Sequence, residues 1–455
     1  MELLLKNANI VTDEKTYMSD IYIKDGVIVK IDKELDISNV KVVDIAGKYL
    51  IPGGIDVHTH FDIDVGIARS ADNFYTGTLA AACGGTTTIV DHMGFGPAGC
   101  NLHHQLNVYY DLAKDSVIDY SFHGVIQHID EDILSEIDEM IKEGIPSFKG
   151  YMTYGYKLSD MDMLKLSEKL GKSGGLLTVH PENNDMVDFL REKFAKEGKL
   201  EPIYHAKSRP DRCEGEAVNR MIDITAQTDC PLYIVHLSSS EALEHIKRAK
   251  DRGQKIYSET CPQYLVLDEE LYRKEDGVKY ICSPPIREKS NQEKLWEGIE
   301  KGYIQTVATD HCSFNYKMKK EMGGEDFRKC PNGLPGVETR IPIIFSEGVS
   351  KGRISVNKFV EIVSTNPAKL FGMYPKKGSI QVGADADLVV IDPNLVKKIT
   401  VNELHENVDY TSFEGIEIKG YPVMTISRGE VIVEDNKFVG EKGRGKFVKR
   451  EAFKF

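Results

Sequence analysis

The central part of the chain alternates short apolar segments with amphipathic ones, a pattern typical of repeated strand–helix units. In Glu131–Glu143 the apolar residues recur at i, i+3, i+4 and i+7, which predicts a helix with one buried face. Similar spacing predicts helices over Glu214–Gln227 and Ser240–Arg252. Asn366-Pro367 is expected to begin another helix, with Asn366 as its cap and the proline in the first turn.

Eight apolar segments in the same region have the length and composition of buried strands. They are Ile55–Thr59, Thr86–Asp91, Asp119–Ile126, Pro146–Gly150, Leu176–His180, Leu232–His236, Lys255–Glu259 and Ile304–Thr309. Eight strand–helix units over about 320 residues favour a TIM (β/α)8 barrel with insertions. A doubly wound parallel sheet is the weaker alternative.

Both ends of the chain have the pattern of short strands without helices between them. Glu2–Val11 and Ile21–Ile31 near the start, and Ala386–Asp392 and Gly429–Val433 near the end, are rich in Ile and Val. We therefore predict two domains of an α/β protein. Residues 1–52 and 375–455 form a small β-sandwich domain built from both termini, and residues 53–374 form the barrel.

Composition and charge narrow the functional classes. The 58 Lys and Arg against 71 Asp and Glu give a net charge of −13, which is atypical of a nucleic-acid-binding protein. The basic tail Lys442–Lys454 is expected to be a solvated or subunit-contacting arm. No apolar run approaches the ~20 residues that a membrane helix needs. The start lacks a secretory signal, and the eight cysteines are scattered, so we expect a cytoplasmic protein with reduced thiols.

Residue types that bind metals recur at the predicted strand ends, where TIM barrels hold their active sites. His58 and His60 share one face of the first strand, because alternate residues point the same way. Four further candidates lie at or just after the ends of later strands: Lys149, His180, His236 and Asp310. Each alone is a modest signal, but their shared position in one barrel predicts a single site.

The residue types also indicate which metals the site would bind. Imidazole and carboxylate without thiolate suit zinc, manganese, iron, nickel or cobalt, and zinc is the default. Six ligands are too many for one catalytic zinc, so we predict two divalent cations about 3.5–4 Å apart. An ammonium beside two dications would be repelled, so Lys149 is either a neutral amine or a carbamate anion that gives one oxygen to each metal.

Several longer segments carry a family resemblance. They are Ile51–Gly54, His58–Ser70, Asp91–Pro97, Cys330–Glu338 and Gly383–Leu388. Through them the chain resembles the cyclic amidohydrolases (hydantoinases, dihydropyrimidinases, dihydroorotases and allantoinases) over nearly its whole length, and the hydantoinases most of all. Dihydroorotases carry an arginine shortly after His-x-His to hold the substrate carboxylate. Here no arginine precedes Arg69, which argues against dihydroorotate.

The resemblance implies a role for each site residue. His58, His60 and Asp310 would bind one metal, His180 and His236 the other, and carboxylated Lys149 would bridge both. Tyr154 would contact the substrate carbonyl and take part in catalysis together with Asp310. The main chains of Ser283 and Asn332 would hold the cyclic amide. The family is usually homotetrameric, and a homotetramer is expected here.

The resemblance also implies a reaction. Hydroxide held by the two metals would open (D-)5-substituted hydantoins, especially those with aromatic substituents, to N-carbamoyl amino acids. Five residues are candidates for an aryl pocket or equally for ordinary core packing: Phe61, Ile63, Phe95, Tyr151 and Met152. Two alternatives remain open. One is a dihydropyrimidinase acting on dihydrouracil or dihydrothymine, and the other is a non-catalytic assembly protein of the same fold.

Overall fold

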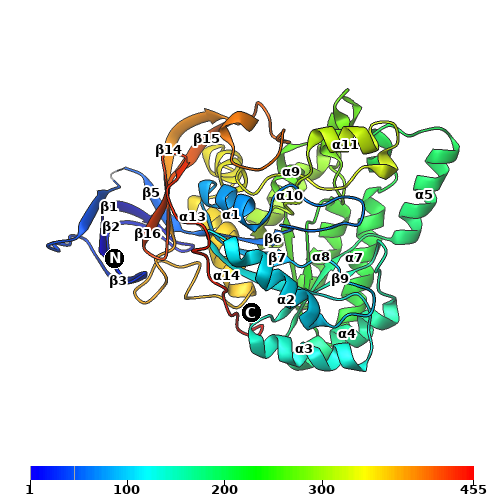
Figure 1. Cartoon of the computed structure of the whole chain (residues 1–455), viewed down its shortest axis with the longest axis horizontal. Coiled ribbons are helices and arrows are strands. Elements are labelled where there is room, and N and C mark those ends of the chain that lie inside the picture. Colours follow the sequence, from blue (N-terminus) through cyan, green and yellow to red (C-terminus); the bar gives the residue numbers. More distant parts are fainter. Residues whose placement is uncertain (1, 46, 455) are drawn as a thin grey trace.

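The computed structural model describes residues 2–45 and 47–454, which fold into two β-sheets and the helices that surround one of them (Figure 1). One sheet has eight strands, all paired in parallel, and comes from the middle of the chain. The other has nine strands and comes from both ends.

The eight parallel strands follow one another around a barrel in their order along the chain. They are β6 (Gly54–Thr59), β7 (Thr86–His92), β8 (Asp119–Val125), β9 (Ser147–Tyr151), β10 (Leu176–His180), β11 (Leu232–Ile234), β12 (Ile256–Thr260) and β13 (Thr306–Val307). A parallel bridge between Thr59 and His311 joins the first strand to the segment after the last. The His60 amide also donates to the His311 carbonyl at 2.9 Å. The predicted TIM barrel is confirmed.

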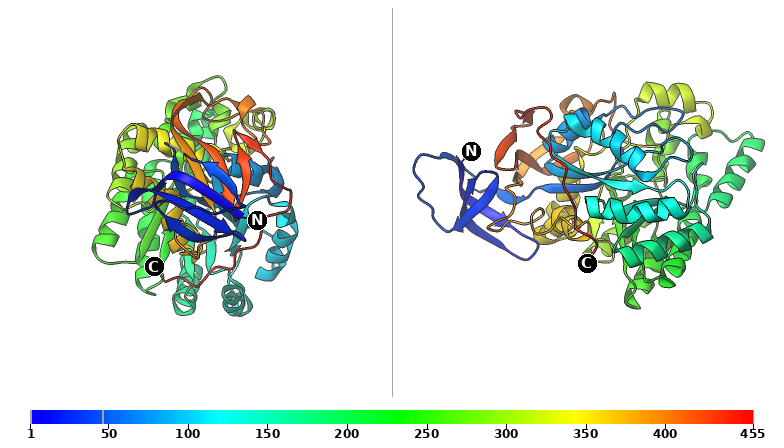
Figure 2. Two further views of the ribbon diagram at one scale, coloured as in Figure 1. Left: turned by 90° about the vertical axis from the view of Figure 1, so that its left-hand side faces the viewer. Right: turned by 60° about the horizontal axis from the view of Figure 1, so that its bottom comes forward.

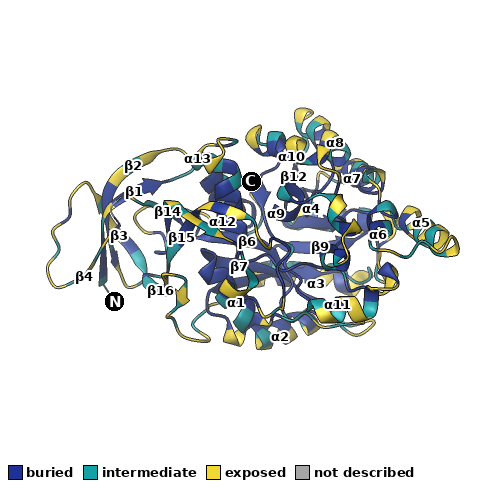
Figure 3. Ribbon diagram, turned by 90° about the horizontal axis from the view of Figure 1, so that it is seen from above, coloured by how far each residue is buried: buried dark blue, intermediate teal, exposed yellow. Residues whose placement is uncertain are grey.

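Helices surround the barrel and turn their buried faces towards its strands (Figure 3). They are α1 (Phe74–Cys83), α2 (Leu102–Leu112), α3 (Glu131–Glu143), α4 (Asp160–Ser173), α5 (Asn184–Lys196), α6 (Ile203–Lys207), α7 (Asp211–Ala226), α8 (Ser240–Asp251), α9 (Pro262–Val266), α10 (Ser290–Glu300), α11 (Tyr316–Gly323), α12 (Arg340–Ile344), α13 (Val356–Val360) and α14 (Asn366–Leu370). Helix α3 has the predicted bounds, because Asp130 caps its first turn and left-handed Gly144 ends it.

The nine-stranded sheet unites the two termini, as predicted. Its strands are β1 (Glu2–Val11), β2 (Thr16–Lys24), β3 (Val27–Asp32), β4 (Lys41–Asp44), β5 (Tyr49–Pro52), β14 (Leu388–Lys398), β15 (Glu417–Ser427), β16 (Glu430–Glu434) and β17 (Lys437–Phe438). Strand β5 pairs with β1 in parallel on one side and with β14 antiparallel on the other, which joins the two halves. The domain limits given above stay a prediction.

Three details differ from the sequence-based expectations. Strand β11 stops at Ile234 and β13 covers only Thr306–Val307, so His236 and Asp310 lie in the segments just after their strands. Asn366 does not cap a helix, because a π-helical turn over Glu361–Thr365 runs directly into α14. Its side chain instead donates to the Gln305 carbonyl and to Glu361.

The basic tail is not a free arm. It runs as a coil along the barrel towards the C-terminus (Figure 2) and bonds to segments next to the barrel strands. The Arg450 guanidinium is buried, and it donates to the Phe122 carbonyl and to the hydroxyls of Ser121 and Ser147. The basic composition of the tail suggested that its side chains would be solvated. A guanidinium, however, has five N–H donors, so it can be buried where carbonyl groups near strand ends lack other partners.

A buried ion cluster connects the barrel to the sheet of the termini. Lys377 is almost fully buried, and its ammonium lies 2.6 Å from both Asp119 of β8 and Asp387, the residue before β14. Asp385 lies at 3.1 Å. Burial lowers the pKa of Lys377, but the three carboxylates outweigh it and hold the pKa above its ordinary value. Removing one partner of such a cluster leaves buried charge uncompensated.

All eight cysteines are free thiols, in agreement with the expectation of reduced sulfur. Among the residues that the structure describes, no helix is long and apolar enough to cross a membrane.

Candidate active site

Three predicted ligands come together where the barrel closes. His58 and His60 lie on or just after β6, and Asp310 lies after β13. The Nε2 atoms of His58 and His60 are 3.2 Å apart, and Asp310 Oδ1 lies 3.1 Å and 3.2 Å from them. Tetrahedral bonds of 2.0–2.1 Å would separate ligand atoms by roughly 3.3 Å. The group therefore fits a metal ion of zinc size.

A carboxylate that was not predicted orients this group. Glu259 on β12 accepts a hydrogen bond from His58 Nδ1, so the Nε2 atom of His58 faces Asp310. Glu259 also accepts from the Tyr233 hydroxyl at 2.9 Å and from the His236 amide at 3.1 Å. Burial lowers the pKa of His58, but Glu259 and Asp310 outweigh it and raise the pKa to about 9. The pocket thus favours a positive charge at this position.

The second pair of predicted ligands lies beside the first. His180 Nδ1 and His236 Nε2 are 2.8 Å apart, and the rings of His58 and His236 lie 5.4 Å apart. The other ring nitrogen of His180 bonds to Glu182 at 2.8 Å, and Glu182 is paired with Arg209. Glu182 therefore turns Nδ1 of His180 towards His236, and these two facing nitrogens could bind one cation.

Lys149 on β9 is the remaining ligand candidate, and its side chain is 2% exposed. In the described residues, 2–45 and 47–454, no carboxylate lies within 4 Å of its Nζ. Burial lowers the pKa of Lys149 to about 8, although Asp310 and Glu259 oppose the shift. A buried amine with a lowered pKa is partly neutral near pH 8. The neutral amine is the form that can react with carbon dioxide to give a carbamate.

Backbone conformation sets some of these residues in place. Tyr154, His236 and Asp310 all have positive φ, at 73°, 40° and 54°. Residues other than glycine rarely adopt this region, and such strain is found most often at functional sites. For His236 and Asp310, the turn directly after a barrel strand directs the side chain into the mouth.

The structure brings all the predicted site residues to one cavity of about 620 Å³. Its lining includes the six metal-ligand candidates His58, His60, Lys149, His180, His236 and Asp310, and also Tyr154, Ser283 and Asn332. Of the candidates for an aryl pocket, Ile63, Phe95 and Tyr151 line it. Phe61 is fully buried against Phe74 and is a core residue. Met152 is not in the lining.

Comparison with known proteins identifies the family. Residues 49–432 match the amidohydrolase family. The chain is also 50% identical over 456 residues to the D-phenylhydantoinases of two Escherichia coli strains, O1:K1 and O45:K1, an alignment that covers 100% of this chain and 99% of each relative.

The chain belongs to the amidohydrolase family.

Solved structures resemble this amidohydrolase over its full length. The dihydropyrimidinase from Brevibacillus agri NCHU1002 and the D-hydantoinase from Bacillus sp. AR9 each have a TM-score of 0.98 at 44% identity, and the alignments cover 100% of both chains. The L-hydantoinase (dihydropyrimidinase) from Arthrobacter aurescens has a TM-score of 0.92 at 30% identity and covers 98% of this chain and 99% of its own.

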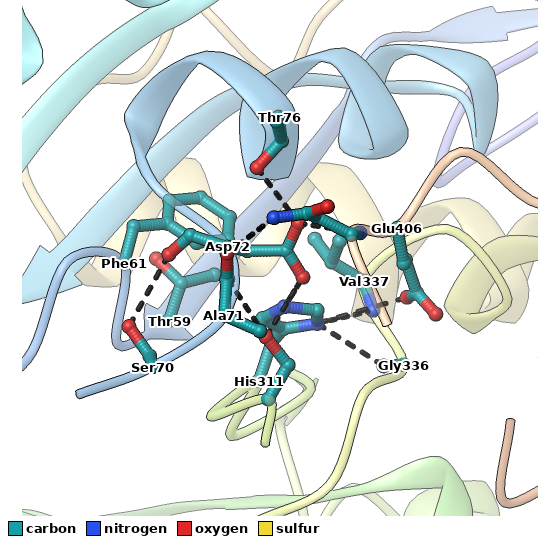
Figure 4. Close-up of polar contacts among 12 residues, drawn as sticks. Thr59, Phe61, Ser70, Ala71, Asp72, Thr76, His311, Gly336, Val337 and Glu406 are labelled. Atoms are coloured by element: carbon teal, nitrogen blue, oxygen red, sulfur yellow. Dashed lines mark hydrogen bonds and ion pairs between the residues drawn. The ribbon is translucent and has the colours of Figure 1, made fainter. Parts of the chain in front are cut away.

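A buried hydrogen-bond network lies behind Asp310 in this amidohydrolase (Figure 4). His311 Nε2 donates to Asp72 at 3.0 Å, and its Nδ1 accepts from the amides of Gly336 and Val337 at 3.1 Å and 3.2 Å. Asp72 also accepts from the Ser313 hydroxyl at 2.8 Å. These bonds therefore anchor His311, the residue directly after Asp310, and the loop that follows Asn332.

Sequence reasoning missed the carboxylates that orient the ligands. Glu259 is the last residue of a predicted barrel strand, and Glu182 follows His180 by two positions, so both were visible as carboxylates near the mouth. Asp72 offered no such signal. It lies before α1, and only the folded chain brings it to His311, 239 positions away.

Glu406 is a buried carboxylate at the edge of this network, with 7% of its surface exposed. It lies 3.7 Å from His311 Nδ1 and accepts from the Glu338 amide at 3.3 Å. Burial raises its pKa, Glu338 and Asp72 add to the rise, and His311 opposes it, so the pKa of Glu406 is about 7. The folded protein therefore holds a proton that the unfolded chain has already lost near pH 6.

Glu406→Gln is expected to make stability less dependent on pH. In the wild type, the stabilising proton is lost as pH rises through 7, which lowers the free energy of unfolding by about 1 kcal/mol between pH 6 and 8. Glutamine cannot titrate, so the variant should lose less of its melting temperature over this range. Calorimetry at pH 6 and 8 measures the difference, and equal losses in the two proteins would contradict the raised pKa.

Proposed function

We propose that this amidohydrolase hydrolyses the cyclic amide bond of 5-substituted hydantoins and releases N-carbamoyl amino acids. The observation that carries the proposal is the convergence of six ligand candidates on one cavity, with Tyr154, Ser283 and Asn332 around the same space. The full-length similarity to D-phenylhydantoinases supports the choice of a hydantoin ring. The six filled ligand positions argue against a non-catalytic assembly protein.

Two divalent cations are part of the proposal, with zinc as the default on ligand type. His58, His60 and Asp310 would hold one cation, His180 and His236 would hold the other, and Lys149 as a carbamate would contribute to both. When bound, the cations lower the pKa of water towards neutrality and polarise a carbonyl oxygen. A carbamate would also replace a buried positive charge beside them with a negative one.

Asp310 is the proposed proton carrier. Burial raises its pKa, but His58, His60 and His236 outweigh it and hold the pKa well below its ordinary value. The carboxylate is therefore ionised and faces the cavity from the turn after β13. It takes a proton from the attacking water and returns it to the ring nitrogen as the amide bond breaks.

Tyr154 and two main-chain segments position the ring. The Tyr154 ring packs 5.1 Å from the His180 ring and 6.0 Å from the Arg209 guanidinium, which holds the phenol beside the second ligand pair. A phenol has a pKa near 10, so its hydroxyl is a donor at neutral pH and can stabilise charge on the carbonyl oxygen. The Ser283 and Asn332 segments offer amide and carbonyl groups to the cyclic amide.

An aromatic substituent is the proposed preference at carbon 5. Phe95 lies 5.0 Å from the Tyr151 ring and 4.6 Å from the Tyr156 ring, and all three line the cavity. Ile63 and Ile67 add apolar surface at the same mouth. A planar ring would bury its faces against these side chains.

The proposal also includes the D enantiomer as substrate, a homotetrameric assembly and a cytoplasmic location. Structures named for D- and L-hydantoinases share this fold, so the fold alone does not select an enantiomer.

Tyr154→Phe is expected to lower kcat by about 100-fold or more, because it removes one donor to the charged transition state. Metal content should not change, since Tyr154 is not a proposed ligand. Steady-state kinetics on 5-phenylhydantoin and metal analysis of the same preparation measure the two effects. Unchanged turnover would remove the proposed role of the hydroxyl.

A substrate panel tests the proposed reaction itself. We expect ring opening of 5-phenylhydantoin to exceed that of unsubstituted hydantoin, dihydrouracil, allantoin and dihydroorotate, as measured by chromatography of the ring-opened products. A higher kcat/KM on dihydrouracil would favour the dihydropyrimidinase alternative, to which the Brevibacillus agri structure gives some weight. Loss of the aryl preference in Phe95→Ala would support the aromatic pocket, and its retention would contradict it.

A further inference from the structure

The charged residues at the mouth of the cavity include one guanidinium without a carboxylate partner. Three arginines line the cavity: Arg191, Arg209 and Arg328. Arg209 is paired with buried Glu182, and Arg328 forms a two-point ion pair with Asp326, at 2.9 Å and 2.7 Å.

Arg191 is different from the other two. In the described residues, 2–45 and 47–454, no carboxylate oxygen lies within 4 Å of its guanidinium, and its one hydrogen bond is to the Arg328 carbonyl at 3.2 Å. Burial, Arg209 and Arg328 lower the pKa of Arg191, and Asp188, one turn earlier on α5, opposes the shift. Asp64 also lines the mouth, but its carboxylate accepts from the Gly66 amide within its own loop.

The position of Arg191 suits an incoming substrate. It is half-buried on α5, which lies at the end of the molecule opposite the sheet of the termini (Figure 1). It shares the cavity with Tyr154 and the metal-ligand candidates. The planar guanidinium therefore borders the space that a substituent on the ring would enter, and it can bind a carboxylate through two donors.

We propose that Arg191 is a carboxylate-binding position, and that the enzyme opens hydantoins whose 5-substituent ends in a carboxylate. The proposal rests on the proposed hydantoinase function and adds a second substrate class to the aromatic one. The aromatic residues Phe95, Tyr151 and Tyr156 would pack against the carbon chain, and Arg191 would bind its charged end. Arg328 forms an ion pair with Asp326, and Arg209 forms one with Glu182. Arg191 is therefore the guanidinium of the three that can bind the carboxylate of a substrate.

The test compares two substrates of equal shape. They are 5-(2-carboxyethyl)hydantoin and its neutral amide, 5-(2-carbamoylethyl)hydantoin. In the wild type we expect the carboxylate to have a KM lower by about tenfold, the size of one charge-assisted hydrogen bond. Arg191→Gln should abolish the difference in KM between the substrates, and Arg191→Lys should keep part of it. Higher salt should narrow the wild-type difference, because the mouth is open to solvent.

Arg212→Gln is the matched control. Arg212 lies on α7, has a 74% exposed side chain and lines a different cavity. The control should keep the wild-type ratio of the two KM values. If Arg191→Gln raises both KM values by the same factor, Arg191 does not bind the carboxylate of the substituent, and the proposal is overturned. It is also overturned if the wild type opens the amide but does not favour the carboxylate. If neither of these hydantoins is opened but 5-phenylhydantoin is, this proposal fails and the proposed function stands; if 5-phenylhydantoin is not opened either, the proposed function itself fails.

Discussion

Close approach of buried imidazoles and a carboxylate is the constraint on which the rest of the structure depends. The facing nitrogens of His58 and His60 lie 3.2 Å apart, and those of His180 and His236 lie 2.8 Å apart. Buried ring nitrogens need a bonding partner, and in each pair the facing nitrogens have the other imidazole as that partner. Cations placed between them would satisfy these nitrogens, and the carboxylates Glu259 and Glu182 orient two of the rings for that purpose.

The barrel makes this approach possible. Its strands come from positions spread over more than half of the chain, but their C-terminal ends meet in one ring. The bridge between Thr59 and His311 closes that ring, and the contact between Asp72 and His311 fixes the turn that carries Asp310. Strain at His236 and Asp310 is held in place by this surrounding structure. Phe95 and Arg191 also line the cavity at this end of the barrel. Phe95 would select an aromatic substituent, and Arg191 would select one that ends in a carboxylate.

Sequence patterns predicted the parts of this arrangement that repeat. Strand-forming segments that end in His180 or contain Lys149 can be recognised locally, and the barrel geometry then places them together. The amphipathic spacing of Glu131–Glu143 likewise predicted α3 with its observed bounds. Long-range partners could not be predicted in this way. Asp72 meets His311 only in the folded chain, and Arg450 is buried because free carbonyls and hydroxyls near the strand ends accept its hydrogen bonds. Helix α14 begins at Asn366 as predicted, but the capping role of Asn366 was wrong, because a π-helical turn runs directly into the helix.

Metal analysis of the wild type beside Lys149→Ala tests the central claim most directly. Purified wild-type protein is predicted to hold about two divalent cations per subunit. The variant should hold fewer, because alanine can supply neither carbamate oxygen, while circular dichroism should report an intact barrel. A wild type that binds no metal, or a folded variant that retains both cations as tightly, would contradict the account.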